Sequence, residues 1–135
     1  MSLMAIDYGG KRIGIAVSDS GLLASPHSVL RNEGDVVARI AEIAGQIGAE
    51  TLILGLPRRP RSAAGEQKFH DLAERLRQKT CKPVILWDET LSTVEAAERL
   101  RAGGRRRRKR TDDIDMYAAT VILQSYLDAR AGRTS

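Results

Sequence analysis

The sequence has few residues suited to covalent or soft-metal chemistry. It contains one cysteine, Cys81, and two widely separated histidines, His27 and His70. A single cysteine excludes an intrachain disulfide framework and cannot form a thiolate metal site by itself. Two histidines so far apart also exclude a local histidine-based zinc motif. If the chain binds a metal, we therefore expect oxygen ligands.

Aromatic residues and long apolar segments are also scarce. Phe, Trp and Tyr make up 4% of the chain, which leaves few platforms for stacking single-stranded bases. No apolar run approaches the roughly 18 residues of a membrane span. The N-terminus lacks the cationic and apolar regions of a signal peptide. We expect a cytoplasmic protein with no membrane attachment.

Positive charge is concentrated in one segment. Lys and Arg number 22 against 17 Asp and Glu, a net charge of +5 in 135 residues. The run Arg105, Arg106, Arg107, Arg108, Lys109 and Arg110 holds more positive charge than this net value, so the remainder is slightly acidic. Such a run is typical of a polyanion-binding loop, and a solvated loop is the alternative.

The length predicts a single domain over 1–135.

Hydrophobic periodicity predicts an α/β fold. Strands are predicted over residues 3–6, 12–18, 25–31, 51–56 and 84–87, and helices over 35–48, 65–80, 92–101 and 112–128. The first two strands flank a glycine turn and predict an antiparallel hairpin. The later strands are apolar throughout and alternate with helices, which indicates parallel strands covered on both faces. We predict a mixed central sheet flanked by helices.

Three carboxylates occupy unusual positions in this pattern. Asp7 ends the first apolar run, Glu89 follows the last predicted strand, and Asp115 shares a helical face with Ala119 and Ile122. An isolated ionised group on an apolar face costs several kcal/mol. Two carboxylates about 4 Å apart repel by roughly 4 kcal/mol at an effective dielectric near 20. If the three converge at one sheet edge they need bound cations, and oxygen ligands favour Mg²⁺ or Mn²⁺.

Each carboxylate also has a simpler interpretation. Asp7 could cap the following turn, and Glu89 could be a solvated strand end. Asp112 or Asp113 is expected to cap the last helix. Asp115 lies past the first turn of that helix, so capping does not account for it.

Four motifs resemble the YqgF family, in the family's order and over nearly the whole chain. They are Asp7-Tyr8-Gly9-Gly10-Lys11-Arg12-Ile13-Gly14-Ile15-Ala16-Val17-Ser18-Asp19, Gly55-Leu56-Pro57, Asp88-Glu89-Thr90-Leu91-Ser92-Thr93, and Asp115-Met116-Tyr117-Ala118-Ala119 leading to Ile122-Leu123-Gln124-Ser125-Tyr126-Leu127. The family is described as Holliday junction resolvases or pre-16S ribosomal RNA nucleases with a ribonuclease H-like fold. The resemblance implies a metal-dependent nuclease for structured nucleic acid, processing the 5′ end of pre-16S ribosomal RNA or, alternatively, resolving branched DNA.

The resemblance also implies roles for single residues. Asp7, Glu89 and Asp115 would be the catalytic triad, holding two Mg²⁺ or Mn²⁺ ions. Gly9 and Gly14 match the tight first hairpin, where a side chain would crowd the backbone. Nucleic-acid contacts are expected from Lys11, Arg12, Ser92 and Thr93, and from two basic segments, Arg58, Arg59 and Arg61 and the run Arg105 to Arg110.

The chain departs from the family pattern at Gly10, at Thr90 and over 58–62, which bears on substrate preference and leaves the triad intact.

Two other function classes stay open. One is a nucleic-acid-binding processing factor with little catalysis. The other is an actin-like or sugar-kinase phosphate hairpin, whose second lobe does not fit in 135 residues. Symmetric junction cleavage would need a homodimer, whereas RNA end processing needs only a monomer.

Overall fold

The computed structural model describes residues 2–56, 63–88 and 111–132. In chain order, the described elements are β1 (Ser2–Tyr8), β2 (Arg12–Ser18), β3 (Ser25–Arg31), α1 (Val36–Ile47), β4 (Ala49–Leu56), α2 (Ala63–Thr80), β5 (Val84–Asp88) and α4 (Thr111–Arg130). The predicted helix over 92–101 lies outside the described residues.

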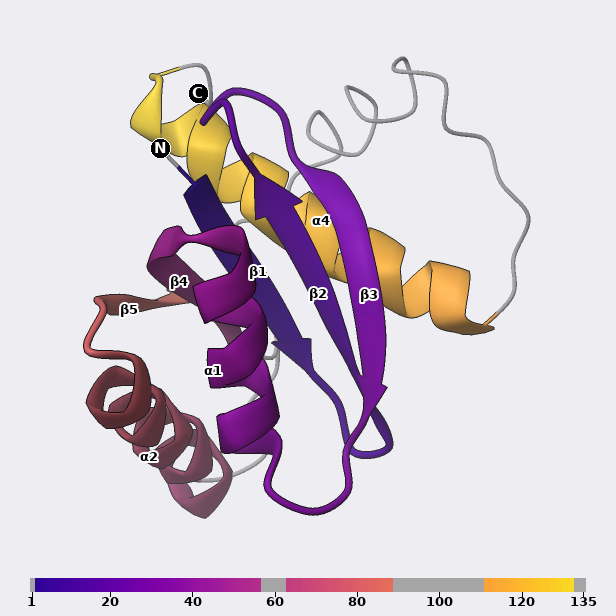
Figure 1. Ribbon diagram of the computed structural model, residues 1–135, viewed down its shortest axis with the longest axis vertical. Coiled ribbons are helices and arrows are strands. Elements are labelled where there is room, and N and C mark those ends of the chain that lie inside the picture. Colours follow the sequence, from indigo (N-terminus) through magenta and orange to yellow (C-terminus); the bar gives the residue numbers. More distant parts are fainter. Residues whose placement is uncertain (1, 57–62, 89–110, 133–135) are drawn as a thin grey trace.

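The five strands form one mixed sheet in the order β3-β2-β1-β4-β5 (Figure 1). β1, β4 and β5 run parallel, whereas β2 is antiparallel to both β1 and β3. The predicted hairpin, the third strand over 25–31 and the mixed sheet are confirmed. β4 begins at Ala49, earlier than predicted, because Ala49 already pairs with Ser2 of β1.

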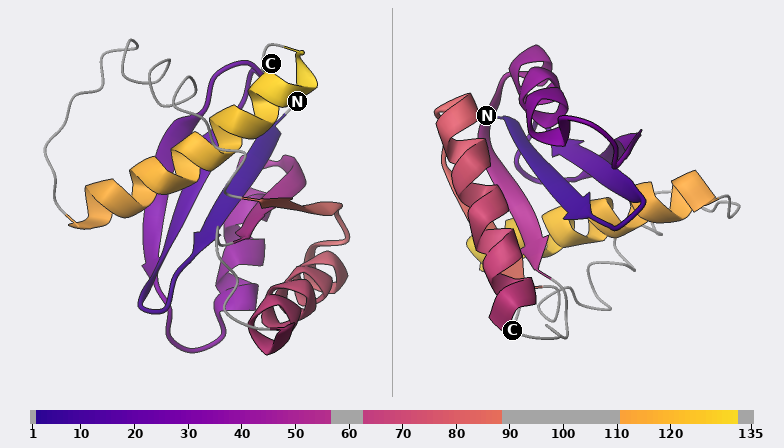
Figure 2. Two further views of the ribbon diagram at one scale, coloured as in Figure 1. Left: turned by 180° about the vertical axis from the view of Figure 1, so that it is seen from behind. Right: turned by 90° about the horizontal axis from the view of Figure 1, so that it is seen from below.

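Helices cover both faces of the sheet, as predicted (Figure 2). Alternate residues of a strand point to opposite faces, and β1 contributes to two core clusters in this way. Met4 and Ile6 pack in the cluster beneath α1 and α2. Leu3 and Ala5 pack in the cluster beneath α4. The sheet therefore has an α1/α2 face and an α4 face.

The predicted boundaries of α1 are confirmed by its capping contacts. The Asp35 carboxylate accepts a hydrogen bond from the backbone N–H of Ala38 at 3.1 Å. Gly48 ends the helix in a left-handed conformation, with φ of 68°, which favours glycine. Among the described helices, none is both long enough and apolar enough to cross a membrane.

A buried glutamine fixes α4 against the sheet. Gln124 is 0% exposed. Its side-chain oxygen accepts from the backbone N–H of Ala24 at 2.8 Å, and its nitrogen donates to the carbonyl of Leu22 at 3.1 Å and to the Asp128 carboxylate at 3.0 Å. These contacts tie the C-terminal half of α4 to the loop between β2 and β3. Apolar periodicity did not predict them.

Candidate active site

Asp7 lies near the carboxyl end of β1, the middle strand of the sheet. It pairs with Gly14 of β2 and is partly buried. Leu3 and Ala5 pack beneath α4, so Asp7, which has the same parity along β1, belongs to the α4 face. Gly14 contributes no side chain to the cross-strand position beside this carboxylate. It lies inside β2 rather than in the turn, so the predicted crowding of the turn applies to Gly9.

The turn over residues 9–11 is held by close backbone contacts. The Gly9 N–H donates to the carbonyl of Arg12 at 3.0 Å. A Cβ on Gly9 would lie 2.7 Å from that same oxygen, closer than a side chain tolerates. This confirms the prediction for Gly9.

Asn32, which directly follows β3, holds the same turn from the neighbouring strand. Its backbone N–H donates to the carbonyl of Lys11 at 2.9 Å. Its side-chain amide donates to the carbonyl of Gly9 at 2.8 Å. The turn beside Asp7 is therefore fixed at both ends. Asn32 was not among the predicted site residues, because a single polar residue at a strand end carries no periodic signal.

Tyr8 packs on the opposite face of the sheet from Asp7. Its ring meets Phe69 of α2 edge-on, with the centroids 6.1 Å apart. Its hydroxyl donates to the side-chain oxygen of Asn32 at 3.5 Å. Tyr8 thus belongs to the core of the α1/α2 face.

The carboxyl ends of the three parallel strands meet at one edge of the sheet. Ile6, Leu54 and Leu86 form one row across β1, β4 and β5. β5 ends at Asp88, which is exposed. Glu89 follows Asp88 in the sequence and lies outside the described residues. The described strands therefore bring Asp7 and the residue before Glu89 to the same edge.

α4 carries Asp115 near its N-terminal end and crosses the face to which Asp7 belongs (Figure 2). Ala119 and Ile122, one and two helical turns further on, are 0% and 2% exposed. The predicted buried face of this helix is confirmed. The Asp115 side chain itself lies outside the described part of the chain.

Gly55 explains how closely α4 approaches the sheet. A Cβ on Gly55 would lie 2.7 Å from Cδ1 of Ile122. The glycine of the Gly55-Leu56-Pro57 motif therefore makes room for the helix.

The helix cap was predicted wrongly. α4 begins at Thr111, so Asp112 and Asp113 lie inside its first turn and not before it. Carboxylates in a first turn still interact favourably with the helix dipole, which is why a cap position and a first-turn position are hard to distinguish in a sequence.

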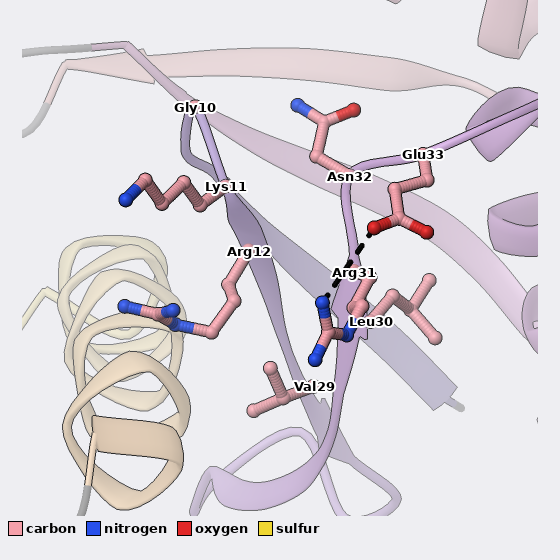
Figure 3. Close-up of a pocket in the computed structure, with 8 residues that line it drawn as sticks. All are labelled: Gly10, Lys11, Arg12, Val29, Leu30, Arg31, Asn32 and Glu33. Carbon is pink, nitrogen blue, oxygen red and sulfur yellow. Dashed lines mark ion pairs between the residues drawn. The ribbon is translucent and has the colours of Figure 1, made fainter.

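Two predicted cations lie beside the turn. Lys11 is exposed and Arg12 is partly buried. In Figure 3 both side chains extend to the same side of the hairpin. They line a groove of about 570 Å³ together with residues at the end of β3, among them Arg31, Asn32 and Glu33. Arg31 was not predicted.

The other predicted nucleic-acid contacts lie outside the described residues. They are Arg58, Arg59, Arg61, Ser92, Thr93, Arg105, Arg106, Arg107, Arg108, Lys109 and Arg110.

The described residues offer oxygen ligands at the Asp7 edge. Cys81 precedes β5 and His27 lies near the start of β3, so both are at the opposite end of the sheet. His70 is exposed on α2. Among the side chains that the structure describes, those of residues 2–56, 64–88 and 117–132, no three His, Cys, Asp or Glu groups form a metal-binding group. Two members of the predicted triad, Glu89 and the Asp115 side chain, fall outside that set.

Comparison with known proteins identifies a family and a fold. The family model described as "RuvX: Holliday junction resolvase" matches residues 1–129. A "Putative pre-16S rRNA nuclease" of Desulforudis audaxviator is 40% identical over 142 residues, which cover 100% of both chains. A protein of the same name from Geobacillus kaustophilus is 38% identical over 96% of this chain and 99% of its own.

Solved structures agree on the fold. RuvC of T. thermophilus, solved with a Holliday junction substrate, has a TM-score of 0.71 and 17% identity, covering 98% of this chain and 97% of its own. The fowlpox virus Holliday junction resolvase has a TM-score of 0.59 and 14% identity, covering 96% and 99%. At such identities the likeness concerns the fold alone, and it confirms the predicted ribonuclease H-like sheet.

Proposed function

This chain belongs to the RuvX family, and from that premise we propose that it processes the 5′ end of pre-16S ribosomal RNA with the help of divalent metal ions. Membership makes it a nuclease, a hydrolase that acts on phosphodiester bonds, and confirms the resemblance to YqgF proteins. Full-length relatives at 38% and 40% identity carry the name of the ribosomal RNA nuclease. That naming favours the RNA precursor as substrate.

The observation that carries the proposal is the position of Asp7. It is a partly buried carboxylate at the end of the middle strand, on the face that α4 covers. A capping role alone does not require the tight turn beside it, which Gly9 and Asn32 hold from two sides. The same turn presents Lys11 and Arg12. A carboxylate and two cations on one fixed hairpin suit a phosphate bound through a metal ion.

The donor set fits Mg²⁺ or Mn²⁺. Asp7, Glu89 and Asp115 would hold two such ions through carboxylate oxygens, the ligands that hard cations prefer. When bound, the ions supply an activated water and stabilise charge on the attacking and leaving oxygens. Cys81 and His27 lie at the opposite end of the sheet, which supports the choice of hard cations over zinc.

The chain's own residues would position the nucleic acid. Lys11 and Arg12 would hold a phosphate beside Asp7, and the fixed turn would keep their spacing to that carboxylate constant. Ser92 and Thr93 would bind phosphate through backbone N–H groups at a helix start. The arginine segments over 58–61 and 105–110 would bind flanking phosphates. Recognition through the backbone agrees with the low aromatic content.

We further propose that residues 1–135 form a single nuclease domain that works in the cytoplasm. All described elements belong to one five-stranded sheet and the helices on it. RNA end processing requires no second active site, so a monomer suffices. A homodimer is expected if the chain resolves junctions, because two strands must then be cut symmetrically.

The second candidate function is resolution of branched DNA, which the description of the family favours. Both candidates are tested by incubating the protein with a labelled pre-16S RNA fragment and a four-way DNA junction, each with Mn²⁺ and with a chelator. We expect Mn²⁺-dependent cleavage of the RNA at its 5′ leader. Cleavage confined to the junction would assign the resolvase function. Binding of either substrate without cleavage would contradict both and leave a binding factor.

A further inference from the structure

Arg12 and Arg31 lie directly opposite each other in the β2–β3 pairing. The neighbouring pair is Gly14 with Val29, and Gly14 is opposite Asp7. Because parity is conserved along a strand, both arginines belong to the face of Asp7. Like charges placed directly opposite each other destabilise an antiparallel pair. An anion bound beside both guanidinium groups would be attracted by both.

The side chain of Arg31 is accessible to an external anion. Its side chain is 79% exposed and lies 3.6 Å from the Glu33 carboxylate, which is itself 69% exposed. An ion pair this exposed contributes little stability. Its geometry leaves most of the Arg31 guanidinium accessible to solvent (Figure 3).

The backbone that carries Arg31 is fixed. The Arg39 guanidinium donates to the carbonyl of Arg31 and, at 3.0 Å, to the carbonyl of Glu33. Asn32 then ties the end of β3 to the turn that carries Lys11. Lys11, Arg12 and Arg31 are therefore held on one rigid unit and line one groove.

The sheet register gives the distance of this groove from the carboxylate. Arg31 is two strands from β1 and two residues beyond the row that contains Asp7. With strands about 4.8 Å apart and a rise of about 3.3 Å per residue, the two Cα atoms are roughly 12 Å apart. With the rise of about 3.4 Å per nucleotide of a DNA duplex as an approximate scale, that is three to four nucleotides.

We propose that Arg31 binds the phosphate backbone of a duplex arm about three to four nucleotides from the bond that is cut, beyond the phosphate that Lys11 and Arg12 would hold beside Asp7. This deepens the proposed function, on which it rests, because it gives the site a second phosphate position over the β2–β3 edge. The competing explanation is that Arg31 protects β3, an edge strand, from pairing with other chains.

The test compares variants that change net charge equally. Arg31→Gln is measured beside Arg75→Gln, an exposed arginine on α2 at the other face of the sheet. Binding is followed by fluorescence anisotropy over a salt series in a chelating buffer, so that no cleavage occurs. The probes are an RNA stem that extends about ten base pairs beyond the cleavage site and the same stem trimmed to about two.

On the long stem, Arg31→Gln should make the negative slope of log K against log salt less steep by about 0.9. If the variant and the wild type bind equally at 1 M salt, this difference in slope makes the variant bind roughly eightfold more weakly than the wild type near 0.1 M salt. Arg75→Gln should bind like the wild type. On the trimmed stem, Arg31→Gln should also match the wild type. Glu33→Gln should bind the long stem more tightly, because it removes a negative charge from the groove.

Three results would overturn the inference. Unchanged RNA binding by Arg31→Gln would mean that Arg31 only protects the edge strand β3 from pairing with other chains. Equal losses of RNA affinity in Arg31→Gln and Arg75→Gln would indicate a general effect of net charge. A loss that persists on the trimmed stem would place Arg31 elsewhere. Failure of the proposed function would give a different result: the wild-type protein would bind the RNA but would not cleave it when metal ions are added. Urea unfolding of each variant checks that the fold is intact.

Discussion

Replacing Gly9 with alanine tests whether the turn beside Asp7 is as tightly constrained as its contacts indicate. The new Cβ would lie 2.7 Å from the carbonyl oxygen of Arg12, a backbone atom that cannot rotate away. A Cβ added to Gly10, the next residue, would meet no atom within 4 Å. Neither glycine has a positive φ, so the two variants differ in contact and not in backbone conformation.

The size of the effect follows from three contributions. Overpacking costs about 1–3 kcal/mol, and weakening the hydrogen bond from Gly9 to Arg12 costs about 0.5–1.5 kcal/mol. Loss of unfolded-state entropy offsets about 0.4–1 kcal/mol. We expect Gly9→Ala to lower the free energy of unfolding by about 0.5–4 kcal/mol. Gly10→Ala should be neutral or slightly stabilising.

Urea denaturation measures both free energies, provided the m-values stay equal. Gly9→Ala should also lower the cleavage rate more than Gly10→Ala, because the displaced turn carries Lys11 and adjoins Asp7. If the two variants were equally stable and equally active, the account of the turn would be wrong.

Two further substitutions test how α4 is fixed to the sheet. Gln124→Leu should lower the unfolding free energy by about 2–4 kcal/mol, because it leaves the buried N–H of Ala24 and the part-buried carbonyl of Leu22 without their partner. The exposed Gln46→Leu should change the unfolding free energy by less than about 0.5 kcal/mol. Equal losses in the two variants would show that Gln124 does not fix α4 to the sheet. Gly55→Ala should cost about 1–3 kcal/mol through its clash with Ile122. Combining it with Ile122→Val, which removes the clashing Cδ1, should cost less than the sum of the single changes in a denaturation cycle, and strict additivity would show that the two residues do not meet.

The fold could be predicted from the sequence wherever a repeating pattern carried the information. Alternation and apolar runs gave the five strands, and the signals at Asp35 and Gly48 marked both ends of α1. The start of α4 is harder to place from the sequence, because Thr111, Asp112 and Asp113 all suit a helix start.

The polar contacts could not be predicted, because their partners are distant in the sequence. Gln124 bonds to residues about a hundred positions away. Asn32 and Arg31 reach the hairpin only because β3 folds back beside β2. A functional role for Asp7 is a prediction that the sequence suggests directly, since a carboxylate between an apolar strand and a double glycine is unusual. Its convergence with Glu89 and Asp115 stays a prediction.

The central claim is that Asp7 holds catalytic metal, and one comparison tests it most directly. Asp7→Asn is measured beside Asp19→Asn, a carboxylate at the opposite end of the sheet that accepts a hydrogen bond from Ser2 at 3.3 Å. Both are assayed for Mn²⁺-dependent cleavage of the RNA precursor, for binding of that RNA and for urea unfolding. We predict that Asp7→Asn abolishes cleavage but keeps binding and stability, while Asp19→Asn cleaves like the wild type. Undiminished cleavage by Asp7→Asn would contradict the account.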